Sequence, residues 1–175
     1  DMMALEIQMA SYNPTYATNL WLDPGSCGAV SANQNYLGIQ AASPTSLTVQ
    51  SDIDDSGVLG DDTNEIITYT YNAGEQYITR ATNCGGAMPF LGDRPASGRP
   101  RGVRVINSDA VPVFQYFNAQ GAAVPAAGLP AGIPNIARID ITLWVETEEI
   151  DASSGQRRRM IYSTSVIPRN HVIRD

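Results

Sequence analysis

The chain has 175 residues, of which 43% are hydrophobic and 17% charged, which is typical of one folded domain over residues 1–175 and excludes an intrinsically disordered chain. The net charge is −7 at pH 7 and the pI is near 4.6. Such an acidic surface repels nucleic acid and anionic lipid, so neither is expected as a partner. No apolar run approaches the roughly 20 residues that a membrane-spanning helix needs.

Residues 1–13 are predicted to form the end of a helix. An apolar stripe recurs there at helical spacing and consists of Met2, Leu5, Met9 and Tyr12. The residue before a proline avoids the helical region of backbone conformation, so the pair Asn13 and Pro14 is expected to end the helix. The apolar stripe would then pack on the domain's own sheet.

The remainder of the chain, residues 14–175, is dominated by strand patterns. The segments with strand character are 36–40, 45–49, 65–82, 101–108, 111–119, 137–149 and 158–168. Within 65–82, the residues Asn72, Ala73 and Gly74 supply a turn, so this segment is expected to be a hairpin. The pattern predicts an α+β fold with a mainly antiparallel sheet.

Segment 137–149 shows the clearest alternation in the chain. Its inward-facing side chains are predicted to be Ile139, Ile141, Leu143 and Val145, and the polar residues between them face the other way. One buried and one solvated face is typical of an antiparallel sheet that is covered on one side. The loop 150–156 would turn the chain into a partner strand, 158–168.

Two long segments, 83–102 and 119–135, are rich in Gly, Pro or Ala and show no regular period. Both exceed the usual length of a loop in a compact domain. Loops of this length serve either as binding surfaces or as mobile connections, and the residues alone favour neither.

The two cysteines, Cys27 and Cys84, lack the spacing of a zinc site, and the only histidine is His171. They are therefore expected to be either an inert buried pair or a disulfide. Without a Ser or Cys motif to accompany it, His171 does not indicate a catalytic triad.

Segment 51–65 follows a predicted strand and is strongly acidic. Its carboxylates are Asp52, Asp54, Asp55, Asp61, Asp62 and Glu65. If an EF-hand loop begins at Asp52, the first ligands would be Asp52, Asp54, Ser56 and the Val58 carbonyl, with Gly57 at the sixth position. The twelfth position is Thr63, which cannot replace the usual bidentate Glu.

Calcium binding would therefore need a non-standard loop that is closed by Glu65, Asp61 or Asp62. The alternative is a solvated turn, because carboxylates that are splayed into water need no cation. We favour a structural Ca²⁺ that fixes the connection between the strands, held by Asp52, Asp54, Ser56, Val58, Asp62 and Glu65.

A run of three arginines, 157–159, opens the last predicted strand. It lies opposite Glu146, Glu148 and Glu149 across the predicted hairpin. Cross-strand ion pairs on a solvated face are the simpler interpretation, and phosphate binding is the alternative.

Three stretches together resemble one family of proteins. "EIQMASYNPT" (6–15) resembles the helix exit of W-type minor pilins of type IV pili and of J-type minor pseudopilins of type II secretion. "SDIDDSG…NEIITYTYN" resembles the family's Asp-rich loop and following strand, and "RIDITLWVETEE…RRRMIYSTSVIPRN" resembles its closing hairpin. The three matches occur in the family's order, although Ser11 stands where the family usually has Gly and the processing site is absent.

This resemblance implies a pilin-like α/β-roll, in which a long N-terminal helix packs on an antiparallel sheet. Residues 1–13 would be the soluble end of that helix, and its absent front half would anchor the full-length protein in the inner membrane. The periplasmic setting favours the disulfide between Cys27 and Cys84, and the family's acidic loops favour the Ca²⁺.

The implied function is that of a non-enzymatic minor subunit in the assembly or tip of a pilus or pseudopilus. Its expected partners are other minor and major pilins or pseudopilins and a tip adhesin. A secreted, calcium-stabilised adhesin or carbohydrate-binding β-domain is the alternative. A hydrolase that uses scattered carboxylates ranks third, because nothing distinguishes a catalytic pair from surface acids.

Overall fold

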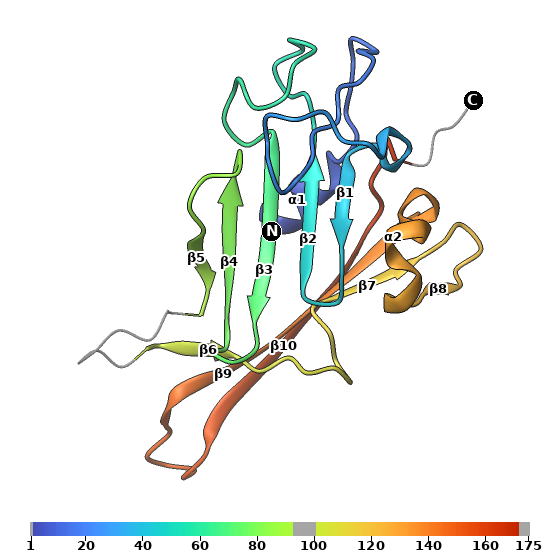
Figure 1. Cartoon of the computed structure of the whole chain (residues 1–175). Coiled ribbons are helices and arrows are strands. Elements are labelled where there is room, and N and C mark those ends of the chain that lie inside the picture. Colours follow the sequence, from blue (N-terminus) through green and yellow to red (C-terminus); the bar gives the residue numbers. More distant parts are fainter. Residues whose placement is uncertain (1, 93–100, 172–175) are drawn as a thin grey trace.

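The computed structural model describes residues 2–92 and 101–171 (Figure 1). The helices are α1 (Met2–Gln8), α2 (Leu129–Gly132) and the short 3-10 turns η1 (Gln34–Tyr36), η2 (Ala126–Gly128) and η3 (Ile133–Asn135). The strands of the first sheet are β1 (Ile39–Ala42), β2 (Ser46–Gln50), β3 (Ile66–Asn72), β4 (Tyr77–Thr82) and β5 (Met88–Leu91). Those of the second are β6 (Val103–Val105), β7 (Phe114–Phe117), β8 (Ala123–Val124), β9 (Arg138–Ile150) and β10 (Arg157–Val166).

The expected α/β-roll is wrong. Two antiparallel sheets make up most of the described chain, and its α-helices have only seven and four residues. Neither helix has the length and apolar character that would cross a bilayer. The error arose because the alternation of apolar and polar residues is the same in both arrangements. It does not distinguish strands of one covered sheet from strands divided between two facing sheets.

The predicted packing face of α1 is also wrong. The buried residues are Met3, Ile7 and Ala10, and they share a face at helical spacing. Three members of the predicted stripe instead point outward, with Met2 49% exposed, Leu5 62% and Met9 42%, and the fourth, Tyr12, is half-buried. Both faces of α1 are apolar, so periodicity alone could not tell which one meets the sheets.

The first sheet is a meander in the order β1-β2-β3-β4-β5. Strands that are consecutive in the sequence are neighbours in this sheet. The β3–β4 connection is a tight turn in which Asn72 Oδ1 accepts the N–H of Glu75, whereas the acidic segment 51–65 joins β2 to β3. The strand pairs predicted at 45–49 and 65–82 correspond to β2, β3 and β4.

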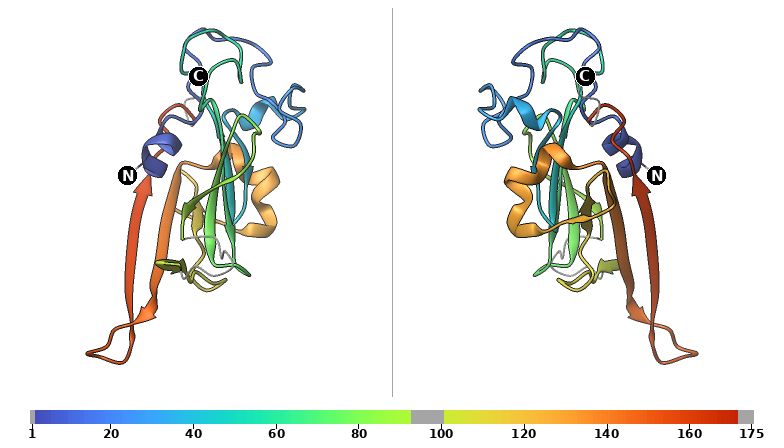
Figure 2. Two further views of the ribbon diagram at one scale, coloured as in Figure 1. Left: turned by 90° about the vertical axis from the view of Figure 1, so that its left-hand side faces the viewer. Right: turned by 90° about the vertical axis from the view of Figure 1, so that its right-hand side faces the viewer.

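The second sheet has the order β10-β9-β7-β8, and β6 also pairs with β9. β9 and β10 form a long hairpin that extends beyond the rest of the molecule (Figures 1 and 2). The alternation predicted for β9 is present in its first half, where Ile139 and Ile141 are buried and their neighbours are more exposed. Further along the strand Leu143 is half-buried, and Val145 and Glu146 are both buried.

One apolar cluster lies between the two sheets and includes buried residues of α1, α2 and both sheets. Among its largest fully buried members are Tyr69, Phe114, Met3, Ile7, Leu47 and Ile139. The sheets are also joined by hydrogen bonds: the hydroxyl of Tyr71 on β3 donates to the carbonyls of Val105 and Asn107, at 3.1 and 2.9 Å.

The chain leaving α1 is bound directly to the first sheet. The N–H of Ser11 donates to the carbonyl of Gln50 at the end of β2, at 2.9 Å, and the N–H of Asp52 donates to the carbonyl of Tyr12, also at 2.9 Å. Gly38 packs against this junction so closely that a Cβ there would overlap Ser11 N and Gln50 O. The acidic loop therefore begins where the exit of α1 meets β2.

Candidate functional site

The acidic segment 51–65 connects β2 to β3, and its two ends are held together. The N–H of Ser51 donates to the carbonyl of Glu65 at 2.9 Å, which extends the antiparallel pairing of β2 and β3 by one step beyond Gln50 and Ile66. Asp52 and Glu65 therefore lie side by side at the base of the loop, although they are far apart in the segment.

Three of the predicted ligands gather at this base. One carboxylate oxygen from each of Asp52, Asp54 and Glu65 lies within 4.8 Å of the others. Asp52 and Glu65 are fully buried, whereas Asp54 is exposed. The cluster thus consists of two buried carboxylates and one at the solvent-facing rim.

Backbone N–H groups of the loop surround the two aspartates. Asp52 Oδ1 accepts the N–H of Ser56 at 3.1 Å, and Asp52 Oδ2 accepts that of Gly57 at 2.9 Å. Asp54 Oδ1 also accepts the N–H of Ser56, at 3.1 Å, and this bond lowers the pKa of Asp54. Gly57 has a φ of +76°, a left-handed conformation that glycine adopts without strain and that turns its N–H toward Asp52.

Glu65 accepts three backbone N–H groups, those of Ile53 at 3.3 Å, Gly60 at 2.7 Å and Asp62 at 3.3 Å. Burial raises the pKa of Glu65 above its ordinary value, and the three N–H groups oppose that rise. The three hydrogen bonds therefore offset only part of the cost of burying the ionised carboxylate of Glu65.

The other predicted ligands make hydrogen bonds of their own within the loop. The hydroxyl of Ser56 donates to the carbonyl of Val58 at 3.1 Å, so these two oxygens face each other. Asp62 Oδ1 accepts the N–H of Thr63 at 2.5 Å. Of the possible closing ligands, Glu65 belongs to the cluster.

The three carboxylates fit a hard cation such as Ca²⁺, which prefers oxygen ligands. Among the described residues, none of the ion pairs involves Asp52, Asp54 or Glu65. Burying two carboxylates without a positive partner is costly, and a cation bound between them removes that cost. Asp52 Oδ1, Asp54 Oδ1 and Glu65 Oε1 each accept one N–H and keep a second lone pair for a metal. Glu65 Oε2 accepts two N–H groups.

Cys27 and Cys84 form a disulfide with their Cα atoms 5.8 Å apart. It joins the loop before η1 to the loop after β4, across 57 positions of the chain. This disulfide and the acidic segment both lie in the connections of the first sheet.

His171 is fully buried, and it lies next to a serine that sequence reasoning did not link to it. Its Nδ1 is 3.0 Å from the hydroxyl of Ser11, and its Nε2 is 2.9 Å from the carbonyl of Ile133. Because a carbonyl only accepts, Nε2 carries the proton and Nδ1 accepts from Ser11. Both side chains are buried, so the pair connects the exit of α1 to η3 and does not face a substrate.

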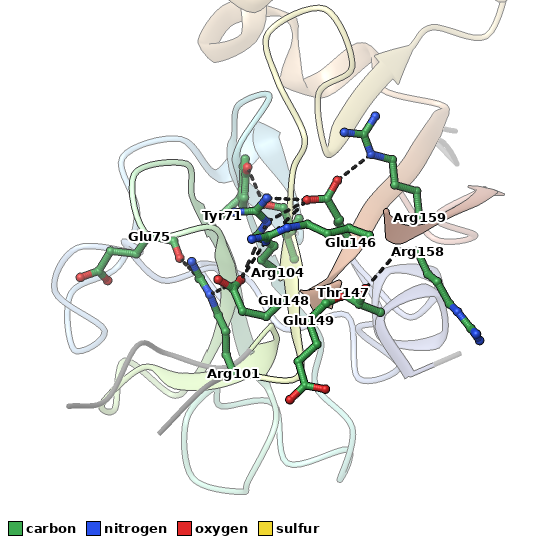
Figure 3. A network of polar contacts seen from close by, with 12 residues as sticks. Tyr71, Glu75, Arg101, Arg104, Glu146, Thr147, Glu148, Glu149, Arg158 and Arg159 are labelled. Carbon is green, nitrogen blue, oxygen red and sulfur yellow. Dashed lines mark hydrogen bonds and ion pairs between the residues drawn. The ribbon is translucent and has the colours of Figure 1, made fainter. Parts of the chain in front are cut away.

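A network of arginines and glutamates covers the outer face of the second sheet (Figure 3). Glu146 on β9 is buried and lies between Arg104 on β6 and Arg159 on β10 in one cross-strand row. Glu146 accepts from Arg104 Nε at 3.1 Å and from Arg159 Nε at 2.6 Å. These bonds, first that of Arg104, lower the pKa of Glu146.

The predicted cross-strand pairing of 157–159 is present in part. Arg157 approaches Glu148 at 3.7 Å and Glu146 at 3.9 Å. Arg158 instead pairs with Asp151, at 2.7 Å from its Nε, while Glu149 is exposed and points away (Figure 3). The register explains this difference, because a bulge between Arg157 and Arg159 shifts the alternation of the side chains.

Two members of the network, Arg101 and Arg104, were not recognised from the sequence. Arg101 pairs with Glu148 at 3.2 Å. Segment 101–108 was predicted to be a strand, but nothing in its residues indicates that it would pair with β9.

The segment 119–135 differs from the long loop that was expected. It contains β8, η2, α2 and η3, and it contributes the buried side chains of Leu129 and Ile133 to the core. Segment 83–102 contains β5, and its residues 93–100 lie outside the described part of the chain.

Comparison with known proteins supplies no relative for these features. No family model, curated protein or solved structure matches the chain.

Proposed function

We propose that this chain is a non-enzymatic assembly subunit of the minor pilin or minor pseudopilin kind, which acts in the periplasm or in the filament that forms there. The observation that carries the proposal is the apolar outer face of α1. This face presents the exposed side chains of Met2, Leu5 and Met9 to solvent. The opposite face, with Met3 and Ile7, is already buried in the core. A contiguous apolar patch on a protein surface marks an interaction site.

The patch continues from α1 onto the second sheet. A groove of about 390 Å³ lies between them and is lined by Leu5 and Gln8 of α1 and by Thr164, Val166 and Ile167 at the end of β10. Ile167 is 61% exposed. A subunit that docks along α1 would cover both parts at once, so other pilins or pseudopilins, or a tip adhesin, are the partners we propose.

The experiment compares two charge substitutions in the full-length protein, produced in cells that assemble the filament or secrete through it. Leu5→Glu places a charge in the patch, whereas Met88→Glu places one at an equally exposed apolar position on β5. We expect Leu5→Glu to reduce filament number or secretion and the recovery of pilin-like subunits with the protein. Equal effects of both variants would contradict the proposal.

A secreted calcium-stabilised binding domain is the second candidate, and the two facing sheets favour it. Such domains bind through loops at the sheet ends or through an exposed sheet face. A glycan array probed with the domain would separate the two candidates: specific sugar binding that persists in Leu5→Glu would favour the binding domain.

For either function, we propose that Asp52, Asp54 and Glu65 hold a structural Ca²⁺. Its role would be to fix the loop that joins β2 to β3 and the exit of α1, which is bonded to that loop through Tyr12.

A further inference from the structure

β10 forms one end of the second sheet. It pairs with β9 on one side, and within residues 2–92 and 101–171 no strand pairs with its other side. With ten residues it is long for an edge strand, and the hairpin carries it clear of the first sheet (Figure 2). An edge of this length presents a row of backbone donors and acceptors that can pair with another strand.

The register shows which backbone groups point outward. The carbonyl of Trp144 accepts from Ile106 and the N–H of Thr142 donates to Val113, so these β9 residues face away from β10. Their neighbour Leu143 therefore faces β10, where it is paired with Tyr162. On β10 the alternate residues, which are Arg159, Ile161 and Ser163, direct their N–H and C=O groups away from the sheet.

The side chains of these residues give the edge a chemical character. Arg157, Arg159 and Ile161 lie on the outer face of the sheet, and Ile161 is 61% exposed. A hollow of about 610 Å³ opens beside them and is lined by Arg104, Glu146, Arg157 and Arg159. The edge thus combines free backbone groups, an apolar side chain and a group of guanidiniums.

Among the ion-paired side chains of this network, guanidiniums outnumber carboxylates. The guanidiniums are those of Arg101, Arg104, Arg157 and Arg159, and the carboxylates are those of Glu146 and Glu148, whereas Glu75 and Glu149 point away (Figure 3). Within the described chain, Arg157 Nη1 has no hydrogen-bond partner, since the two carboxylates stay 3.7 and 3.9 Å away. The local excess is notable in a chain whose net charge is −7.

We propose that β10 binds an extended acidic segment of a partner protein by strand addition, a partner contact that rests on the assembly function proposed above. The backbone of the segment would pair with Arg159, Ile161 and Ser163. One of its carboxylates would face Arg159, and an apolar side chain two positions away would lie beside Ile161.

The charges favour an acidic segment over a second copy of this chain. Two copies of β10 that paired antiparallel about Ile161 would place Arg159 opposite Ser163. In this register each Arg159 faces a serine and receives no carboxylate, and both molecules carry a charge of −7. A carboxylate opposite Arg159 compensates the local excess instead.

The test uses fluorescein-labelled heptapeptides and fluorescence anisotropy. One peptide alternates Val and Glu, and the other alternates Val and Lys. We expect the protein to bind the Glu peptide, with an affinity that falls as salt is added, and not the Lys peptide. Equal binding of the two peptides, or binding of neither, would overturn the proposal.

Two neighbouring arginines provide a matched pair of variants. Arg159→Gln removes a charge from the outer face and should weaken binding of the Glu peptide by roughly tenfold, which is the strength of one charge-assisted hydrogen bond. Arg158→Gln makes the same change in net charge, but Arg158 pairs with Asp151 away from the network. Equal losses in both variants would show only a general effect of charge and would refute the proposed position.

Ile161→Pro tests the backbone pairing. Because the N–H of Ile161 points away from β9, proline removes a donor from the free edge and leaves the ladder with β9 intact. Loss of peptide binding with an unchanged melting temperature is expected. If the domain instead forms dimers that Ile161→Pro dissociates, the edge belongs to a second copy and the proposal fails.

These outcomes are separable from the proposed function. The Leu5→Glu experiment probes α1 and does not alter the outward groups of β10. If the peptides fail to bind but Leu5→Glu still impairs assembly, the strand-addition site is rejected and the proposed assembly function is retained.

Discussion

Glu6 of α1 holds Arg80 of β4 in a two-point ion pair, with Oε1 2.6 Å from Nη2 and Oε2 3.2 Å from Nε. The same carboxylate accepts the hydroxyl of Tyr69 on β3. The pair keeps the pKa of Arg80 above its ordinary value, and burial together with Glu6 raises that of Tyr69. α1 is therefore fastened to the first sheet by a polar contact as well as by Met3 and Ile7.

Glu6→Ala is expected to lower the free energy of unfolding by about 2 kcal/mol, since it leaves Arg80 and Tyr69 without their shared partner. Urea unfolding measures this change. Glu75→Ala, at an exposed turn position, serves as the control and should stay within about 0.5 kcal/mol of the parent. A loss no larger than that of the control would contradict the role of Glu6.

Gly38→Ala is expected to destabilise the domain by about 3 kcal/mol, because the new methyl group would displace the hydrogen bond between Ser11 and Gln50. Gly86→Ala is a matched control, since a Cβ at Gly86 meets nothing within 4 Å. Thermal unfolding of both variants checks the prediction. If Gly38→Ala melts with the control, the close packing at this junction is not rigid.

Calcium is expected to raise the melting temperature. At a concentration one hundred times its dissociation constant, a ligand of the folded state adds about 2.7 kcal/mol, which corresponds to roughly 5–10 °C for a domain of this size. Melting curves recorded with Ca²⁺ and with chelator measure the shift. Glu65→Gln and Asp52→Asn should abolish it, whereas Asp61→Asn, which lies outside the cluster, should retain it. Equal melting temperatures with and without Ca²⁺ would exclude the site.

The pH dependence without metal follows from Glu65. Its pKa is raised in the folded state, so the folded protein holds this proton more tightly than the unfolded chain does. The stability that this proton adds to the folded state is fully present below the unfolded pKa of about 4.3. It is lost as pH rises through the pKa of Glu65 in the folded state. We therefore compare the free energies of unfolding of the parent and of Glu65→Gln in the presence of chelator. The parent should lose stability relative to the variant as pH rises from about 4 to about 7.

The opposite slope would contradict this assignment. Glu146 and Asp151, which lie outside the cluster, have lowered pKa values and contribute stability that is lost as pH falls. Because both are present and distant from residue 65 in either protein, the difference between the parent and Glu65→Gln cancels them. Denaturant unfolding at several pH values gives that difference directly.

The disulfide contributes about 4 kcal/mol in the chain-entropy model, given the 57 positions between its cysteines. The double variant Cys27→Ser, Cys84→Ser should lower the free energy of unfolding by that amount, and a reductant should have no further effect on it. Urea unfolding with and without reductant makes the comparison. If the parent is insensitive to reductant although its thiols become titratable, the prediction fails.

The longer strands could be predicted from the sequence because each carries its own pattern, whereas β5 and β8 lie in segments that show no regular period. The alternation from Ile139 to Val145 indicates one buried face whatever lies opposite. The division of the strands between two sheets could not be predicted, because it depends on which strands pair at a distance, as β6 does with β9. The buried face of α1 was missed for a related reason, since Met3 and Ile7 follow the helical period as well as Met2 and Leu5 do.

The candidate site was predictable in composition but not in geometry. The Asp-rich pattern identifies Asp52 and Asp54, and it left Glu65 as one of three closing ligands. Only the pairing of Ser51 with Glu65 brings that carboxylate to Asp52 and buries both. Ser56 and Val58 were chosen from the spacing of an EF-hand, which has flanking helices, whereas here the loop joins two strands. Asp62 was chosen only as a possible closing ligand.

The two backbone bonds at the exit of α1, from Ser11 to Gln50 and from Asp52 to Tyr12, have a mechanical consequence. A pull on the N-terminal segment is delivered into β2, which lies inside the first sheet with a strand on either side. A second path leads to the other sheet, because the N–H of Arg169, just beyond β10, donates to the carbonyl of Gln8 in α1 at 3.3 Å. Tension applied at the N-terminal segment would thus be divided between the two sheets.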